Sequence, residues 1–209
     1  MGGKSVILAD LNTEATRWRE NSMAEYITQI DFRILDWIQA NLRTEWLDWF
    51  MPKITFLCNG GWFWIAIALL CLIWKKHRRC GFNIATGLIL ASLFGSILLK
   101  NLVARSRPCW INTAIEMLIQ IPTDYSFPSG HSMASFASAV VLLQYDKRIG
   151  IPAIILAALI AFSRLYLYVH FPSDVIVGTP LGILFGILAP RITEYIYNAY
   201  NDYRKRHTV

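Results

Sequence analysis

The sequence predicts an all-α membrane protein, a polytopic bundle of five to six transmembrane helices preceded by amphipathic interfacial helices. Hydrophobic residues make up 55% of the 209 residues. The mean hydropathy is positive, which is too apolar for an ordinary soluble protein of this size. Several apolar runs reach or approach the length that spans a bilayer, and charged residues gather beside them.

The N-terminal part, residues 1–58, is predicted to lie against the membrane. Residues 1–22 are polar and mixed in charge, and we expect them to be mobile. Residues 26–43 and 45–58 are expected to form interfacial helices, with tryptophans suited to headgroup depth at Trp37, Trp46 and Trp49. Spacings of three and four give the first helix one apolar stripe, made by Ile27, Ile30, Ile34, Ile38 and Leu42. A soluble-type amphipathic helix packed on the membrane domain is an open alternative.

Five apolar segments follow and form the predicted transmembrane domain, residues 59–200, before a basic tail at 201–209. The expected spans cover residues 61–74, 82–103, 131–143, 151–168 and 175–188. The first can borrow residues 56–60, and the third is short because its first turn belongs to a polar motif. Whether residues 50–58 make a sixth, partial crossing is left open.

Basic residues orient these spans. They cluster at 75–79, 147–148 and 204–206, and the positive-inside bias assigns all three clusters to the cytoplasmic side. The loops 104–130 and 169–174 then face the outside. We interpret the net charge of +6 as orientation and lipid-headgroup charge, so no nucleic-acid partner is expected.

Small residues recur along three of the spans at intervals of three or four. They are Gly178, Gly182 and Gly186 on the last span, Gly87, Ala91 and Gly95 on the second, and Ser132, Ser135 and Ala139 on the third. Such faces let helix backbones approach closely in lipid. We favour packing within one chain over homodimerisation, and the oligomeric state stays open.

Three polar segments carry residues with catalytic chemistry, and all three lie at the predicted outer ends of the spans. They contain Lys100, Arg107 and Pro108, then Pro128, Ser129, Gly130 and His131, then Ser163, Arg164, His170 and Asp174. Ser129 is a good N-cap for the helix that follows, and the first turn of a helix is a ready anion site. Asp174, one helical turn after His170, can reach back to that histidine.

Lys100, Arg107 and Arg164 are expected to form a cationic cradle for phosphate. Charged groups at span ends are costly unless they are paired or bind something charged, and nearby carboxylates are too few to neutralise these three. Two arginine forks and a lysine suit a phosphate group. Arg105 lies in the same loop and is expected to be a headgroup or surface charge.

The order and spacing of these eleven residues resemble the three-part signature of the type 2 phosphatidic acid phosphatase family, and no position departs from it. The resemblance covers residues 100–174. It implies that His170 is a nucleophile forming a phospho-histidine, that Asp174 orients it, and that His131 is the general acid. It also implies phosphate binding by Lys100, Arg107, Arg164 and the backbone near Ser129 and Gly130.

No metal or other cofactor is expected. One carboxylate and two histidines among three cations make a poor cation site, and the four cysteines fit no zinc pattern. Free thiols are favoured, although Cys58 and Cys109 share the predicted outer face and their pairing is left open.

The resemblance favours an integral-membrane lipid phosphatase, multi-pass in the cell membrane, with its site on the extracytoplasmic side. Undecaprenyl diphosphate phosphatases look most similar, and a phosphatidylglycerophosphate or phosphatidic acid phosphatase is the alternative. A non-enzymatic lipid transporter or scaffold is less favoured, because binding alone needs neither histidine nor Asp174. The expected partners are a lipid phosphate and the bilayer.

Overall fold

The structure is a computed structural model that describes the backbone of residues 3–207 and the side chains of residues 23–207. Its helices are α1 (Gly3–Leu42), α2 (Glu45–Phe56), α3 (Trp62–Ile73), α4 (Arg78–Leu90), α5 (Lys100–Val103), α6 (Pro108–Ile111), α7 (Gly130–Tyr145), α8 (Lys147–Tyr166) and α9 (Pro172–His207). Short 3₁₀ turns occupy Asn59–Gly61 and Lys75–His77, and a π-helical stretch, Ala91–Leu99, joins α4 to α5 in one long rod. No strand occurs between residues 3 and 207, so the predicted all-α class is confirmed.

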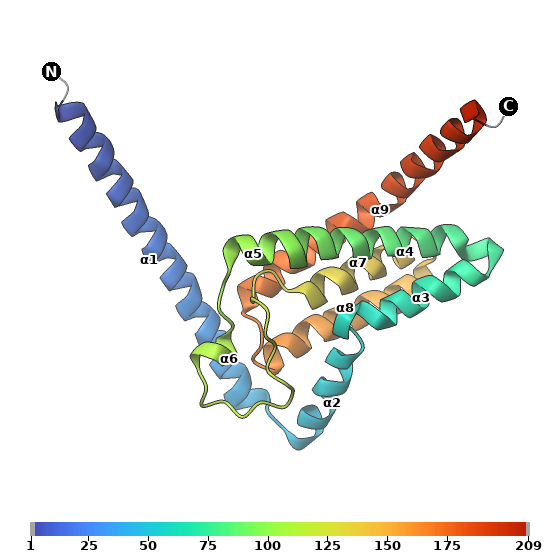
Figure 1. The fold of residues 1–209 in the computed structure, drawn as a ribbon. Helices are drawn as coiled ribbons and strands as arrows, with labels where there is room; N and C mark the ends of the chain where they lie inside the picture. Colours follow the sequence, from blue (N-terminus) through green and yellow to red (C-terminus); the bar gives the residue numbers. More distant parts are fainter. Residues whose placement is uncertain (1–2, 208–209) are drawn as a thin grey trace.

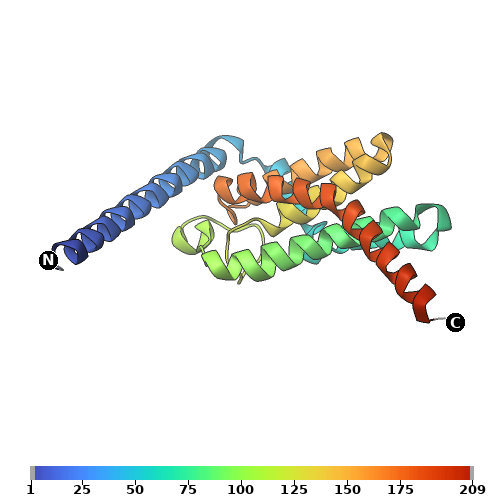
Figure 2. The same cartoon turned by 90° about the horizontal axis from the view of Figure 1, so that it is seen from above.

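Helix α7 forms the centre of the bundle. It packs along α8 and α9 and also contacts α3 and α4 (Figures 1 and 2). Its interior side chains are mostly small, with Ser132, Ser135, Ala137 and Ala139 fully buried. The N-terminus of α7 carries the second motif, so the centre of the bundle leads directly into the polar end.

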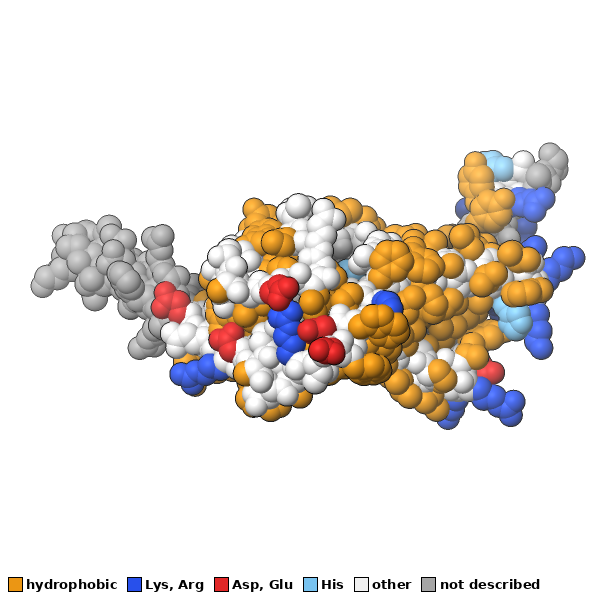
Figure 3. Space-filling view, turned by 90° about the horizontal axis from the view of Figure 1, so that it is seen from below, with side chains coloured by type: hydrophobic (Ala, Val, Ile, Leu, Met, Phe, Trp, Pro, Cys, Tyr) orange, Lys and Arg blue, Asp and Glu red, His pale blue; other side chains and the backbone are white. Residues whose placement is uncertain are grey.

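The outer flank of the bundle is apolar, as expected for a protein in a bilayer (Figure 3). Exposed large hydrophobic side chains include Ile65, Leu69, Ile89, Leu93 and Ile97. Three helical segments are long and apolar enough to cross a membrane: Lys75–Ile111, Lys147–Tyr166 and Pro172–His207. Helix α2 and the segment Asn59–Ile73, bent by 45°, pass the same test together. Length and composition therefore support up to four crossings in the described part of the chain, and the count of five to six stays a prediction.

The basic loops gather at one end of the bundle, as the charge pattern predicts. The loop after α3 meets the end of α7, where His77 Nδ1 lies 2.6 Å from the hydroxyl of Tyr145. The C-terminal turns of α9 point toward the same side in Figure 1. The polar motifs lie at the opposite end.

The glycine spacing on α9 serves packing against α7. A Cβ at Gly182 would lie 2.5 Å from the carbonyl oxygen of Met133, and one at Gly186 would lie 2.7 Å from that of Ala137. These distances are too short for any side chain, so the two backbones touch because the residues are glycines. The favoured interpretation, packing within one chain, is confirmed for this face.

Helix α1 differs from the prediction in length and in its buried face. It is continuous from Gly3, so the stretch expected to be mobile is helical from residue 3 onward. Its C-terminal part packs on α8 and α9 and buries Asp31, Leu35 and Ile38. Ile30 and Ile34 from the predicted stripe are exposed instead. The boundary with α2 falls at residues 43–44 as expected, where Thr44 caps the second helix.

The close contact between α9 and α7 predicts a difference between two Gly→Ala variants. Gly182→Ala should lower stability by about 1–3 kcal/mol, because the added methyl group overpacks against backbone that cannot move aside. Gly87→Ala should be neutral or slightly stabilising, since its Cβ would make ordinary contacts of 3.6 and 3.7 Å and alanine favours helix. Melting temperatures of both variants in detergent test this, and equal values would contradict the packing described.

Candidate active site

The three motif segments converge on one cavity of about 710 Å³ at the polar end of the bundle. Its wall includes Lys100, Arg107, His131, Arg164 and His170. These residues come from α5, the loop before α6, the first turn of α7, the end of α8 and the loop before α9. The predicted convergence of the motifs is therefore confirmed.

His170 is buried, and its two ring nitrogens face different partners. Nε2 lies 3.1 Å from Nη1 of Arg107, and a guanidinium only donates, so Nε2 is the nitrogen without a proton. Nδ1 lies 3.4 Å from Oδ2 of Asp174, which suits an N–H donor. Burial, followed by the charges of Arg107, Arg164 and Lys100, holds the pKa of His170 well below its usual value. The ring is neutral at pH 7, with its lone pair toward the cationic side of the cavity.

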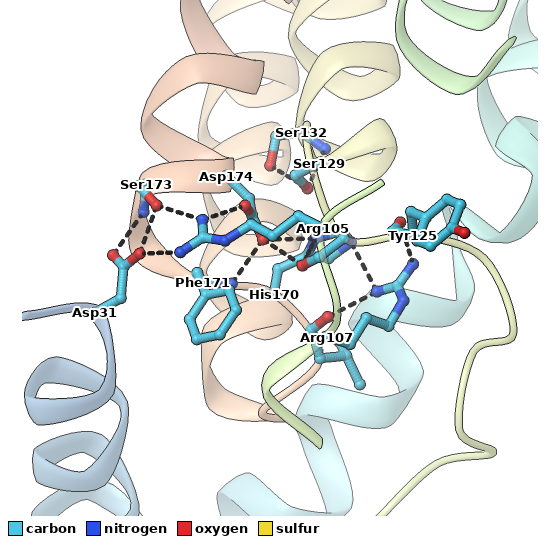
Figure 4. A network of polar contacts seen from close by, with 12 residues as sticks. Asp31, Arg105, Arg107, Tyr125, Ser129, Ser132, His170, Phe171, Ser173 and Asp174 are labelled. Atoms are coloured by element: carbon cyan, nitrogen blue, oxygen red, sulfur yellow. Dashed lines mark hydrogen bonds and ion pairs between the residues drawn. The ribbon is translucent and has the colours of Figure 1, made fainter. Parts of the chain in front are cut away.

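Asp174 is fully buried and surrounded by donors (Figure 4). Its Oδ2 accepts from the backbone N–H of Phe171 at 2.8 Å, from the hydroxyl of Ser126, and from His170. Its Oδ1 accepts from Arg105 at 2.8 Å. A carboxylate, which only accepts, matches this set, and it supports the expected pairing of Asp174 with His170.

Arg107 is held on every side of its guanidinium group. It donates to the carbonyl oxygens of Asp124 and Val169, each at 2.6 Å, and to the carboxylate of Asp124 at 2.7 Å. The same carboxylate accepts from Lys100. The loop after α6 thus places one carboxylate, Asp124, between Lys100 and Arg107, and a single carboxylate is still too few to neutralise the three cations of the predicted cradle.

Asp124 bridges two of the cations that line the cavity, Lys100 and Arg107. Burial acts to raise the pKa of its carboxyl, but the hydrogen bond and charge of Lys100, aided by those of Arg107, hold this pKa below its usual range. The side chain is 57% exposed. A partly exposed loop carboxylate on two buried cations is an exchangeable partner, since an incoming phosphate offers the same oxygen acceptors with more charge.

Arg164 is buried and has donor capacity to spare. Its Nη1 donates to the hydroxyl of Thr55 on α2 at 2.5 Å. Its Nε has no partner, and this atom and the hydroxyl oxygen of Ser138 are the buried side-chain N and O atoms without one in the described part of the chain. A buried guanidinium that lines a cavity with an unused N–H is suited to an anion.

His131 stands on the first turn of α7 at the rim of the same cavity. Its Nε2 lies 3.1 Å from the side-chain oxygen of Asn59, so this nitrogen is the one that carries a proton to donate. Ser129 caps the helix as predicted, because its hydroxyl accepts from the N–H of Ser132 at 3.4 Å. Gly130 lines a second cavity that adjoins the first.

Comparison with known proteins decides the family. Residues 81–197 match the family model described as the PAP2 superfamily, which is more than half of the chain. The chain belongs to the PAP2 superfamily.

Relatives in this superfamily share both sequence and fold with the chain. It is 36% identical over 142 residues to an undecaprenyl-diphosphatase of Sulfolobus acidocaldarius, covering 66% of this chain and 68% of that protein. The crystal structure of Aquifex aeolicus LpxE aligns with a TM-score of 0.68 at 28% identity, over 77% of this chain and 94% of that one. A PAP2 type phosphatidylglycerolphosphate phosphatase from Bacillus subtilis aligns with a TM-score of 0.68 at 27% identity, over 82% and 88% of the two chains. These relatives confirm the predicted class of membrane-bound phosphatase.

Several residues of this PAP2 site escaped the sequence prediction. Arg105 was expected on the surface, but it pairs with Asp31 and Asp174, each at 2.8 Å, so that expectation is wrong. Asp124 and Ser126 lie just before the second motif, and their position in a polar loop beside it was the available signal. Thr55 comes from the N-terminal part and Asn59 from the turn that follows it; neither segment carries any of the signature, and no local pattern marks these two residues.

Among residues 23–207, no group of three or more His, Cys, Asp or Glu side chains is arranged to hold a metal ion. All four cysteines are free. Cys58 and Cys109 are both buried and free, so the pairing left open by the sequence is not formed.

The bridging position of Asp124 predicts the effect of removing its charge. Asp124→Asn should lower KM for a phosphate substrate by up to about 5-fold, since a partly exposed ion pair contributes at most about 1 kcal/mol. Product phosphate should inhibit the variant more strongly for the same reason. Steady-state kinetics of Asp124→Asn provide the test. The control is Glu116→Gln, which removes the charge of an exposed acid on the same loop. A higher KM or a large loss of kcat would instead mean that Asp124 serves mainly to hold Arg107 in place.

Proposed function

We propose that this chain hydrolyses the phosphate group of a membrane lipid through a phospho-histidine formed on His170. One observation carries the proposal: the neutral, buried ring of His170 lines one cavity together with three cations, and one of these, Arg164, keeps a buried donor without a partner. Binding alone would need the cations but not a histidine held in one tautomer by a carboxylate. The non-enzymatic alternative is therefore less favoured.

Phosphate binding is the first step of the proposed reaction. Phosphate oxygens replace Asp124 on Lys100 and Arg107 and take up the free donor of Arg164. Drawing Arg107 toward the phosphate releases its contact with His170 and frees the Nε2 lone pair. The three fixed cations then stabilise the charge that develops on the phosphoryl oxygens, which is why we propose that no metal ion is required.

Chemistry then follows in two displacements. His170 Nε2 attacks phosphorus, the bond from phosphorus to the leaving oxygen breaks, and His131 gives its proton to that oxygen. Water next attacks the phospho-histidine, returns a proton to His131, and breaks the N–P bond to release phosphate. Throughout, Asp174 holds the Nδ1 proton and favours the positive charge that the ring acquires.

A lipid substrate is supported by the second cavity. It has a volume of about 570 Å³, shares Lys100, Asp124 and His131 with the first cavity, and continues between α3 and α4. Its far wall is apolar and includes Ile65, Leu69, Leu72, Leu88 and Ile89. Phosphate and hydrocarbon would thus be held side by side, and binding of the tail would help to position the phosphate.

The substrate that we favour is a polyprenyl diphosphate, undecaprenyl diphosphate being converted to its monophosphate. The 36% identity to an undecaprenyl-diphosphatase supports this choice. A phosphatidylglycerophosphate is the second candidate, because the chain also aligns with the phosphatidylglycerolphosphate phosphatase of Bacillus subtilis.

We further propose that the site faces the extracytoplasmic side. The basic corner at 75–79 and 147–148 lies at the end of the bundle away from the cavity, and basic loops are retained on the cytoplasmic side.

The purified chain in detergent should release phosphate from undecaprenyl diphosphate much faster than from a water-soluble phosphate ester, and excess chelator should not change this rate. His170→Ala should lose several orders of magnitude in kcat, as expected for a covalent nucleophile, with its melting temperature retained. His207→Ala, on the C-terminal turn, is the matched control. Wild-type turnover by His170→Ala would refute the mechanism, and a rate restored only by added Mg²⁺ would refute metal independence.

Orientation can be tested with a single cysteine at Thr113, which is exposed in the loop after α6. In a variant freed of its native cysteines, Thr113→Cys should react with an impermeant thiol reagent on intact cells. A cysteine at Lys76 should react only after permeabilisation. The reverse pattern would place the site on the cytoplasmic side.

A further inference from the structure

Helix α1 makes direct contacts with the loop that carries His170, although no part of the signature lies on it. The hydroxyl of Tyr168 donates to Asp36 on α1 at 2.7 Å. The ring of Phe171 packs edge-on against Phe32, with centroids 5.1 Å apart. The backbone N–H of Ser173 donates to Asp31 at 3.0 Å. Three positions within six residues of the loop are therefore tied to one face of α1.

This loop needs such support because its backbone is strained. Tyr168 has a φ of 57°, in the left-handed region that an aromatic residue rarely adopts. The hydroxyl of Tyr168 is protonated at physiological pH and holds this residue to Asp36. The contact with α1 thus stabilises the backbone two residues before His170.

Arg105 extends the connection from α1 to the site (Figure 4). Its Nη2 donates to Oδ2 of Asp31 at 2.8 Å, while Nη1 donates to Oδ1 of Asp174 at 2.8 Å. Nη1 also lies 2.7 Å from the hydroxyl of Ser173, which in turn donates to Asp31 at 2.5 Å. The guanidinium carbon lies 4.0 Å from the ring centre of Phe171, so both its edges and one face are held.

This arrangement divides the oxygens of Asp174 between two tasks. Oδ2 serves the loop and His170, whereas Oδ1 points to Arg105. A guanidinium fork that grips one carboxylate on each side fixes the plane of both. Asp31 is 3% exposed and Asp174 is fully buried, so the two carboxylates depend on the cation between them.

We propose that Arg105 is a positioning residue, held by Asp31 of α1, which sets the orientation of Asp174 and through it the ring of His170. In this view α1 is part of the active site, and its attachment tunes catalysis. The inference rests on the proposed function, since it assumes that His170 must be neutral to attack phosphorus.

Charge makes the inference testable, because the two partners should shift the site in opposite directions. Without the positive charge of Arg105, the negative charges of Asp31 and Asp174 are uncompensated, and they favour the protonated form of His170. Without the negative charge of Asp31, the positive charge of Arg105 acts on Asp174 alone and favours the neutral form of His170. The other charged or titratable groups around His170 stay the same in each variant: Lys100, Arg107, Asp124, His131 and Arg164.

The experiment compares Asp31→Asn, Arg105→Gln and the double variant with wild type, using the full chain in detergent and a lipid diphosphate. Arg105→Gln should reduce kcat by roughly 10- to 100-fold, the size expected for lost orientation. The acid limb of its kcat/KM profile should move to higher pH. Asp31→Asn should lose less activity and move this limb to lower pH. The acid limb of the double variant should lie close to the wild-type pH. Arg33→Gln, an exposed arginine on α1, should leave both quantities unchanged.

A purely structural role has a different signature. Acid limbs that stay at the wild-type pH in every variant, with activity falling only in step with melting temperature, would overturn the proposal. If Arg105→Gln does not fold, the shift of the acid limb in Asp31→Asn tests the proposal by itself, because that variant keeps the contact between Arg105 and Asp174. Ionisation of the substrate contributes equally to the pH profile of every variant, so it cancels when each acid limb is compared with that of wild type. The controls separate the two hypotheses. An active His170→Ala variant would refute the proposed function. If His170→Ala is inactive but the acid limbs of the Asp31 and Arg105 variants stay at the wild-type pH, only the role of Arg105 is refuted.

Discussion

The structure of the site depends on how an apolar bundle accommodates several buried charges at one end. Five ionised side chains that are each less than a tenth exposed meet there: Asp31, Lys100, Arg107, Arg164 and Asp174. Withdrawing such groups from water costs several kcal/mol each unless they are paired. Shared ion pairs offset most of this cost. The carboxylate of Asp124 bridges Lys100 and Arg107, and the guanidinium group of Arg105 joins two buried carboxylates. Arg164 keeps a buried donor without a partner, and that deficit is what a phosphate would relieve.

Helix packing far from the chemistry determines where these charges stand. Glycines on α9 bring its backbone against α7, and the contact nearest the site is that of Gly178 with Ser129. There the N–H of Ser129 donates to the backbone carbonyl of Asp174 at 3.2 Å. The same close approach therefore places the capped start of α7 beside the start of α9. His131 and His170 reach one cavity because these two helix ends cannot move apart without losing that contact.

The N-terminal helices contribute more to the site than a membrane anchor would. Helix α2 supplies Thr55 to Arg164, and α1 supplies Asp31 to Arg105 and to the first turn of α9. The division into an N-terminal part and a phosphatase domain stays a prediction. The contacts show that residues on both sides of that division hold the cavity in shape. The exposed isoleucines of α1 leave this helix an apolar face for lipid even while its other face is packed.

Local features of the sequence were sufficient for much of this protein. Hydropathy and helical periodicity act over one or two turns, so the all-α class, the N-cap at Ser129 and the boundary near Thr44 could be predicted. The spacing of the motifs also identified five of the residues that line the cavity: Lys100, Arg107, His131, Arg164 and His170. Partners brought together by the fold could not be predicted in this way. Asp124 lies 24 residues from Lys100, and Asp31 lies 74 residues from Arg105. Only the packing of α1 and the path of the loop after α6 decide which carboxylate neutralises which cation, because electrostatic pairing depends on distance in space and not on distance along the chain.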